Sequence, residues 1–183
     1  MINILPYLPE RSAQPRETGV TMMMDKGLSF RQAEDFIAHS GHLADVIKLG
    51  FGTSLVAKNV KEKIKLYQDA GLRVYVGGTL FEAFIIRNKF DEYRKYIDNL
   101  GLDTCEVSDG SIVLDHGKKC DYISKLAKNY RVLSEVGSKE AGILIAPAKW
   151  ISMMKAELDA GSWKVIAEAR EAGNVGIYRP NGT

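Results

Sequence analysis

The stretch that decides the fold is Asp45–Thr79, DVIKLGFGTSLVAKNVKEKIKLYQDAGLRVYVGGT. It opens with a short apolar run, Asp45–Leu49, and closes with a second one, Arg73–Val76, and a glycine-bearing turn follows each run. Between the two runs, Val56–Ala70 has helical periodicity, with an apolar stripe and lysines elsewhere, and Gly71 is typical of a helix end. A strand, a helix and a second strand in this order predict a βαβ unit with parallel strands.

The same alternation of apolar runs and helical stretches continues on both sides of this unit. Strands are expected at Gly19–Met24, Asp45–Leu49, Arg73–Val76, Thr104–Val107, Arg131–Ser134 and Lys164–Ala167. Helices are expected at Phe30–His39, Val56–Ala70, Phe81–Arg87 with Phe90–Leu100, Lys118–Asn129 and Pro147–Ala160. A proline-bearing arm, residues 1–18, precedes them, so we expect the domain to cover residues 19–183.

The spacing of the predicted strands separates two α/β architectures. Strand ends recur about every 29 residues, close to the spacing of a TIM barrel with its roughly 250 residues over eight units. A doubly wound open sheet also uses βαβ repeats, but DKGLS after the first strand lacks the GxGxxG pattern of a dinucleotide-binding turn. We therefore expect a TIM-type (β/α) barrel, truncated after about six βα units, as an oligomer whose copies or terminal segments cover the open strand edges.

Composition excludes several classes of partner. The chain has 25 basic and 23 acidic residues, a formal net charge of +2, which leaves no large excess of positive charge to bind nucleic acid or an anionic membrane. No apolar run approaches the roughly 18 residues that a membrane span needs, and the first residues lack a signal-peptide pattern. We therefore expect a cytoplasmic protein that acts on small molecules. The lysine run at positions 58, 61, 63 and 65 is expected to be a solvated helix face.

Charged residues stand at or just after the C-terminal ends of most predicted strands, where α/β proteins place their sites. They are Asp25 and Lys26, Lys48, Glu106, Glu135, and Glu168 with Arg170. An isolated buried charge is unfavourable, so such residues must be paired, hydrated or bound to a metal ion. One of them alone is as often a structural ion pair, but recurrence along the strands favours a functional site. Gly77 and Gly78 bring flexible backbone amides to the same end, which suits phosphate or carboxylate binding.

The sequence around these residues resembles the phosphosulfolactate synthase family along nearly the whole chain from Gly19. The motifs that carry the resemblance are, in order, MDKGL (24–28), DVIKLGFGTS (45–54), GGTLFE (77–82), EVSDGS (106–111), LSEVGSK (133–139) and EAREAGNVGI (168–177). The resemblance implies a TIM barrel and a carbon–sulfur lyase of coenzyme M biosynthesis, which adds sulfite to phosphoenolpyruvate in a magnesium-dependent reaction. Family members continue with two further strands, and some are heat-stress-associated plant proteins.

The reaction that the resemblance implies assigns roles to the charged residues. Sulfite attack at C3 of phosphoenolpyruvate gives an aci-carboxylate dianion, which is then protonated at C2. The candidate Mg²⁺ ligands are Asp25, Glu106, Glu135 and Glu168, since Mg²⁺ prefers carboxylate oxygens. The candidate substrate-binding residues are Lys26, Lys48, Gly77, Gly78 and Arg170. Lys139 matches the family's proposed proton donor, and the competing interpretation is a solvent-exposed loop lysine.

Two other functions remain open from the sequence. The first is a non-catalytic relative, stress-associated or scaffolding, that keeps the charged ring for stability. The second is an unrelated TIM-type aldolase or isomerase. Charges kept at the strand ends favour the enzyme, whereas the absence of the last two units from this sequence favours the non-catalytic relative.

Overall fold

The computed structural model describes residues 6–7, 10–50, 52–138, 145–169 and 176–179, and within them strands and helices alternate. The strands are β1 (Met22–Asp25), β2 (Val46–Leu49), β3 (Arg73–Val76), β4 (Thr104–Ser108), β5 (Arg131–Val136) and β6 (Lys164–Ala167). The helices are α1 (Phe30–Ser40), the 3₁₀ turn η1 (Gly41–Leu43), α2 (Thr53–Val56), α3 (Val60–Asp69), α4 (Gly78–Ile85), α5 (Phe90–Asn99), α6 (His116–Leu126) and α7 (Pro147–Asp159).

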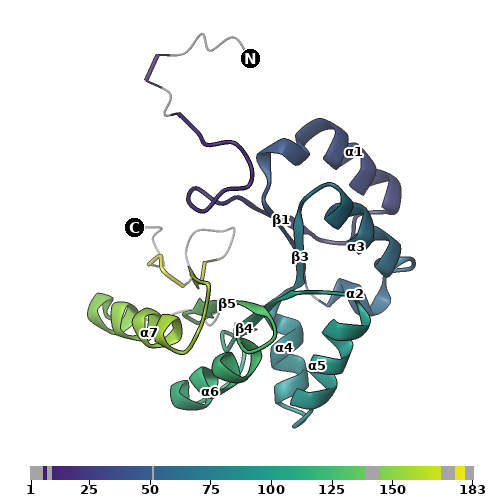
Figure 1. Cartoon of the computed structure of the whole chain (residues 1–183). Helices are drawn as coiled ribbons and strands as arrows, with labels where there is room; N and C mark the ends of the chain where they lie inside the picture. The colour runs from purple at the N-terminus through teal and green to yellow at the C-terminus, as the bar shows by residue number, and fades with distance from the viewer. Residues whose placement is uncertain (1–5, 8–9, 51, 139–144, 170–175, 180–183) are drawn as a thin grey trace.

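The strands are parallel and follow one another in chain order, as the sequence predicts. β1, β2 and β3 form one hydrogen-bonded sheet, and β4, β5 and β6 form another. β3 and β4 lie against each other where the two sheets meet, without a ladder of backbone hydrogen bonds. In Figure 1 the helices lie on the outer side of the strands, from α1 at the top round to α7 at the lower left. The α/β fold of TIM type is therefore confirmed.

The predicted elements agree with the observed ones except near their ends. α1 begins where expected because Ser29 forms a capping box with Gln32, in which each side chain accepts a hydrogen bond from the other residue's backbone amide. The helix expected at 56–70 corresponds to α3, which begins only at Val60, after Asn59 in a left-handed conformation (φ 56°); Thr53–Val56 form a separate short helix, α2, that was not predicted. β1 is shorter than predicted and ends at Asp25.

Alternation along the strands sorts their side chains into two layers. Outward residues such as Ile47 and Val107 join the large apolar core between strands and helices. Inward residues form a small second core of Val46, Tyr75 and Leu133. Because side chains two apart share a face, Lys48 follows Val46 inward and Glu135 follows Leu133 inward. The strand period thus places charged side chains at the inner, C-terminal end of the strands.

The N-terminal arm packs at the opposite end of the strands. Arg16 forms an ion pair with Asp45, just before β2, at 2.8 Å, and it also donates to the backbone oxygen of His42. Arg11 donates to the Thr21 hydroxyl and to the Leu43 carbonyl oxygen. These contacts tie the described part of the arm to the segments just before β1 and β2, and neither arginine contacts the charged side chains of the site described below. Its separation from the domain at residue 18 stays a prediction.

Candidate functional site

The centre of the site is a lysine held between two glutamates. Lys48 Nζ lies 2.9 Å from Glu106 Oε1 and 3.5 Å from Glu135 Oε2. β2 supplies the lysine, β4 and β5 supply the glutamates, and all three stand at or near the C-terminal ends of these strands. Glu106 is fully buried and Glu135 nearly so. This ion cluster joins the two sheets across the interior.

The two carboxylate oxygens of Glu106 differ in their hydrogen bonding. Its Oε1 accepts from Lys48 and, at 2.6 Å, from the Gly78 amide, whereas its Oε2 is buried and accepts no hydrogen bond from the described residues. Burial raises the pKa of Glu106, the Lys48 charge opposes this rise and the Glu135 charge adds to it. Burial raises the pKa of the Tyr75 hydroxyl, and the charge of Glu106 and the proximity of its carboxylate raise this pKa further, although the hydroxyl has no partner at normal hydrogen-bond geometry among the described residues.

The glycine pair after β3 packs against the protein's own ion cluster. The sequence suggests Gly77 and Gly78 as amide donors to substrate, but the structure shows the Gly78 amide bound to Glu106. A Cβ atom at Gly78 would lie 2.6 Å from Glu106 Oε1 and would also collide with Ser108 Oγ. One at Gly77 would lie 2.8 Å from Lys48 Cε. Gly78 is therefore needed for the close approach of α4 to the ion cluster, and a side chain at Gly77 would displace the end of Lys48.

Gly78→Ala is expected to destabilise the protein by about 1–3 kcal/mol, because the added methyl group overpacks a buried region in which the neighbouring atoms are already in close contact. Gly41→Ala is the matched control, since a Cβ atom there meets its nearest neighbour at an ordinary 3.6 Å and the backbone is helical. Denaturant unfolding of the two variants measures the difference. Equal stability of the two would show that the glycine is not needed for packing.

Asp25 is buried at the end of β1, in a separate cluster. Its Oδ2 lies 2.7 Å from Lys63 Nζ and accepts from the Tyr67 hydroxyl at 3.1 Å, while its Oδ1 accepts from the amides of Gly27 and Leu28. Both oxygens are thus engaged, which disfavours this aspartate as a metal ligand.

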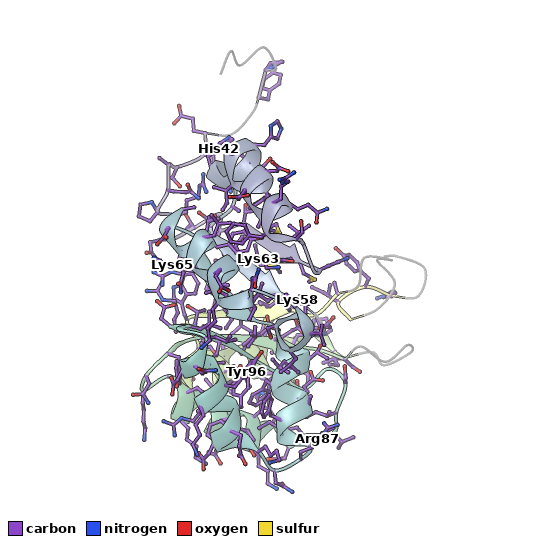
Figure 2. The ribbon with its side chains drawn as sticks, turned by 90° about the vertical axis from the view of Figure 1, so that its right-hand side faces the viewer. His42, Lys58, Lys63, Lys65, Arg87 and Tyr96 are labelled. Carbon is purple, nitrogen blue, oxygen red and sulfur yellow. The ribbon has the colours of Figure 1, made fainter. Side chains whose placement is uncertain are left out.

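The same contact corrects the expected solvated lysine face. Lys63 is buried, whereas the Lys65 side chain is 74% exposed; Figure 2 shows Lys65 near the margin of the view and Lys63 nearer its middle.

The remaining predicted residues fall into two groups. Lys26 is exposed in the loop after β1, and Glu168 is buried directly after β6, where its amide donates to the Val136 carbonyl oxygen at 2.8 Å. A Cβ atom at Gly137 would lie 2.7 Å from Glu168 Cβ, so β6 and the end of β5 are tightly packed there. Lys139 and Arg170 lie outside the described residues.

Two buried side chains near the cluster were missed by the sequence analysis. Glu82 of α4 accepts from the Ser108 hydroxyl and from the Ser111 amide, so it holds the loop after β4. Lys119 of α6 is fully buried and contacts the end of β5. The available signal was its place on an apolar stripe, four residues before Ile123 and seven before Leu126, both fully buried.

The site contains carboxylates that can bind a metal ion and a lysine that can bind an anion. Mg²⁺ is commonly held by one or two carboxylates, with waters and substrate oxygens completing the shell. Within the described ranges, no group of three or more His, Cys, Asp or Glu side chains is placed to hold a metal ion by itself. Glu106, whose buried Oε2 accepts no hydrogen bond from the described residues, lies beside the Glu135 charge and fits a two-carboxylate site of this kind. Lys48 adds a cation that could contact an anionic substrate.

Comparisons with known proteins identify a matching family, similar sequences and a similar fold. The model of the (2R)-phospho-3-sulfolactate synthase (ComA) family matches residues 9–183. The chain is 36% identical to the phosphosulfolactate synthase of Bacillus subtilis (strain 168), over 96% of this chain and 70% of that protein. It is 38% identical to that of Methanothermobacter thermautotrophicus, over 99% and 73%. A 3-hexulose-6-phosphate synthase crystal structure superposes with a TM-score of 0.48 and 19% identity, over 84% of this chain and 67% of that one.

Proposed function

Because the chain belongs to the phosphosulfolactate synthase family, we propose that it catalyses the addition of sulfite to phosphoenolpyruvate to form phosphosulfolactate. The observation that carries the proposal is the buried Lys48–Glu106–Glu135 cluster at the C-terminal strand ends. A cluster retained only for stability would be expected to satisfy its buried polar atoms, and Glu106 Oε2 has no hydrogen-bond partner within the described part of the chain. This favours the enzyme over a non-catalytic relative.

The proposal includes a magnesium ion held by Glu106 and Glu135. The first offers a buried oxygen that accepts no hydrogen bond from the described residues, and the second lies on the neighbouring strand with its charge close enough to raise the Glu106 pKa. Glu168 remains a further candidate at the adjacent strand end. When bound, Mg²⁺ would stabilise the negative charge that develops on the substrate carboxylate.

Substrate binding and proton transfer are assigned to the chain's own residues. As sulfite forms a bond to C3, the electrons of the carbon–carbon double bond move toward the carboxylate, and a proton must reach C2 to complete the product. Lys48, 12% exposed beside the cluster, would contact the carboxylate or phosphate of the substrate. Lys26 is exposed after β1 and would bind the second anionic group. Lys139 and Arg170, outside the described residues, stay proposals as proton donor and anion-binding residue.

The experiment that tests the function is direct. Purified protein, incubated with phosphoenolpyruvate, sulfite and Mg²⁺, is expected to form phosphosulfolactate, and a chelator is expected to stop the reaction. Phosphorus NMR and mass spectrometry detect the product. Glu106→Gln should lower the rate and raise the Mg²⁺ concentration needed, because one ligand oxygen is lost. A protein that folds but forms no product under any Mg²⁺ concentration would favour the non-catalytic alternative.

The proposal also covers the cellular location and the oligomeric state. Among the described residues, no helix combines the length and the hydropathy of a membrane span. The cytoplasmic location stays part of the proposal. β1 and β6 each have a hydrogen-bonded neighbour on one side only among the described strands, which supports a homo-oligomer. Size-exclusion chromatography with light scattering tests the second point.

A further inference from the structure

Lys119 is a fully buried lysine that touches none of the proposed ligands' carboxylate oxygens. It projects from α6, and its Nζ lies 2.8 Å from Asp109 Oδ1, 2.8 Å from Glu157 Oε1 and 2.6 Å from the backbone oxygen of Glu135. An ammonium group has three protons, and each of these acceptors can take one. The Lys119 ammonium group thus contacts three elements: the loop after β4, helix α7 and the C-terminal end of β5.

The contact with the Glu135 backbone fixes the strand end that carries a proposed ligand. Glu135 pairs in register with Ser108 of β4 on one side and with Ile166 of β6 on the other. Its side chain reaches Lys48, while its carbonyl oxygen is held by Lys119. Movement of this carbonyl would therefore move the Glu135 carboxylate relative to Lys48 and Glu106.

The placement of Lys119 is unfavourable unless all its partners are present. A buried ammonium is expensive to desolvate, and burial with a carboxylate rarely adds stability over an apolar pair of the same volume. Glu157 Oε2 is buried and accepts no hydrogen bond from the described residues, although His116 Nε2 lies 3.3 Å from Oε1. A helix pair such as α6 and α7 could pack through apolar residues instead. The charged contact therefore indicates a role beyond packing.

We propose that Lys119 is a positioning residue that fixes the end of β5 and, through it, the geometry of the Lys48–Glu106–Glu135 cluster. The inference rests on the proposed function, since it gives Glu135 a part in binding a divalent cation. Lys119 contacts Glu135 through the backbone and holds Asp109 in the loop after β4. It acts on the site by holding two adjacent strand ends in one arrangement.

The test uses Mn²⁺ as the probe and measures its binding to the metal-free protein without substrate, by the loss of the free-ion EPR signal. Lys119→Met is expected to weaken Mn²⁺ binding by about 10- to 100-fold, the range found for residues that orient metal ligands. Glu135→Gln should weaken it comparably. Lys63→Met is the matched control, because it removes another buried lysine from a buried carboxylate, Asp25, outside the cluster.

A second variant separates positioning from stability. Lys119→Met combined with Glu157→Met replaces the whole buried pair by apolar side chains, which should restore the thermal midpoint. It should not restore Mn²⁺ affinity, because the Glu135 carbonyl oxygen still lacks its donor.

The proposal is overturned if affinity returns together with stability, or if Lys63→Met weakens Mn²⁺ binding as much as Lys119→Met. It is also overturned if the unmutated protein binds no Mn²⁺. Normal Mn²⁺ binding without phosphosulfolactate formation would instead remove the proposed reaction.

Discussion

Lys48→Met is expected to lower the free energy of unfolding by about 3–5 kcal/mol at neutral pH and to lower kcat/KM by about 10²- to 10³-fold. The lysine is the shared partner of Glu106 and Glu135, at 2.9 Å and 3.5 Å. Without it the two buried carboxylates lose the cation that they share. Denaturant unfolding and steady-state kinetics measure the two effects.

The stability loss should depend on pH in a defined direction. Burial already raises the pKa of Glu106, and the Lys48 charge is the factor that lowers it most. Removing Lys48 therefore raises this pKa further above its unfolded value of about 4.3. A carboxyl with a raised folded pKa contributes stability below its unfolded pKa and loses it as the pH rises through the folded pKa. The difference in stability between Lys48→Met and the unmutated protein should thus be small in acid and grow with rising pH.

A divalent cation should partly reverse the effect. If Glu106 and Glu135 are metal ligands, Mg²⁺ would replace the missing positive charge and stabilise Lys48→Met more than the unmutated protein. Lys65→Met is the control, because its exposed pair with Asp69 is worth under about 1 kcal/mol. A loss that is the same at every pH would contradict the role of Lys48 in lowering the Glu106 pKa, and a loss that Mg²⁺ leaves unchanged would contradict metal binding by the two glutamates.

The fold could be predicted from the sequence because its signals are local. β3 and β6 have the predicted bounds, since each is a short apolar run between a helix end and a turn. The non-helical segment between α2 and α3 was missed because VAKNV carries no proline or glycine; there Ala57 is extended and Asn59, just before α3, is left-handed. A single asparagine is a weak signal, since it is tolerated in helices as well.

The site could be predicted only as a set of strand ends. Period-two alternation and parallel order bring Lys48, Glu106 and Glu135 together, and both are readable from sequence. The partner of each charge is not readable, because it depends on distances between residues far apart in the chain. Lys63 and Lys119 illustrate this, since each looks like an ordinary helix-surface lysine and each is buried against an acidic partner. A lysine on an apolar stripe is the signal that could have found them.

The separation of Asp25 from the cluster has a consequence for the loop after β1. Asp25 Oδ1 accepts from the amides of Gly27 and Leu28, and Lys63 Nζ donates to the Leu28 carbonyl oxygen at 2.7 Å. The buried pair thus sets the path of the loop that carries Lys26. Asp25 would then act on the site by holding this loop in place, which its fully engaged oxygens support better than metal binding.

Lys139→Ala is expected to lower kcat by about 10²- to 10⁴-fold, the usual loss when a positioned general acid is removed, while the thermal midpoint stays nearly unchanged. The expectation rests on the proposed role of Lys139, which lies outside the described residues, as the donor of the proton to C2. From the sequence we expect an exposed lysine, and exposed charges contribute under about 1 kcal/mol to stability, so activity and stability should separate. Product formation and thermal unfolding are measured on the same preparation.

Two further variants distinguish proton transfer from charge. Lys139→Arg keeps the positive charge but cannot release a proton in the working pH range, so it should be as inactive as Lys139→Ala if the lysine is the proton donor. If Lys139 only binds an anion, arginine should restore most of the activity. Lys58→Ala, at an exposed lysine after α2, controls for the loss of one surface charge and should keep full activity. Full activity of Lys139→Ala would place the proton donor elsewhere, and Lys26, exposed just after β1, would be the next residue to test.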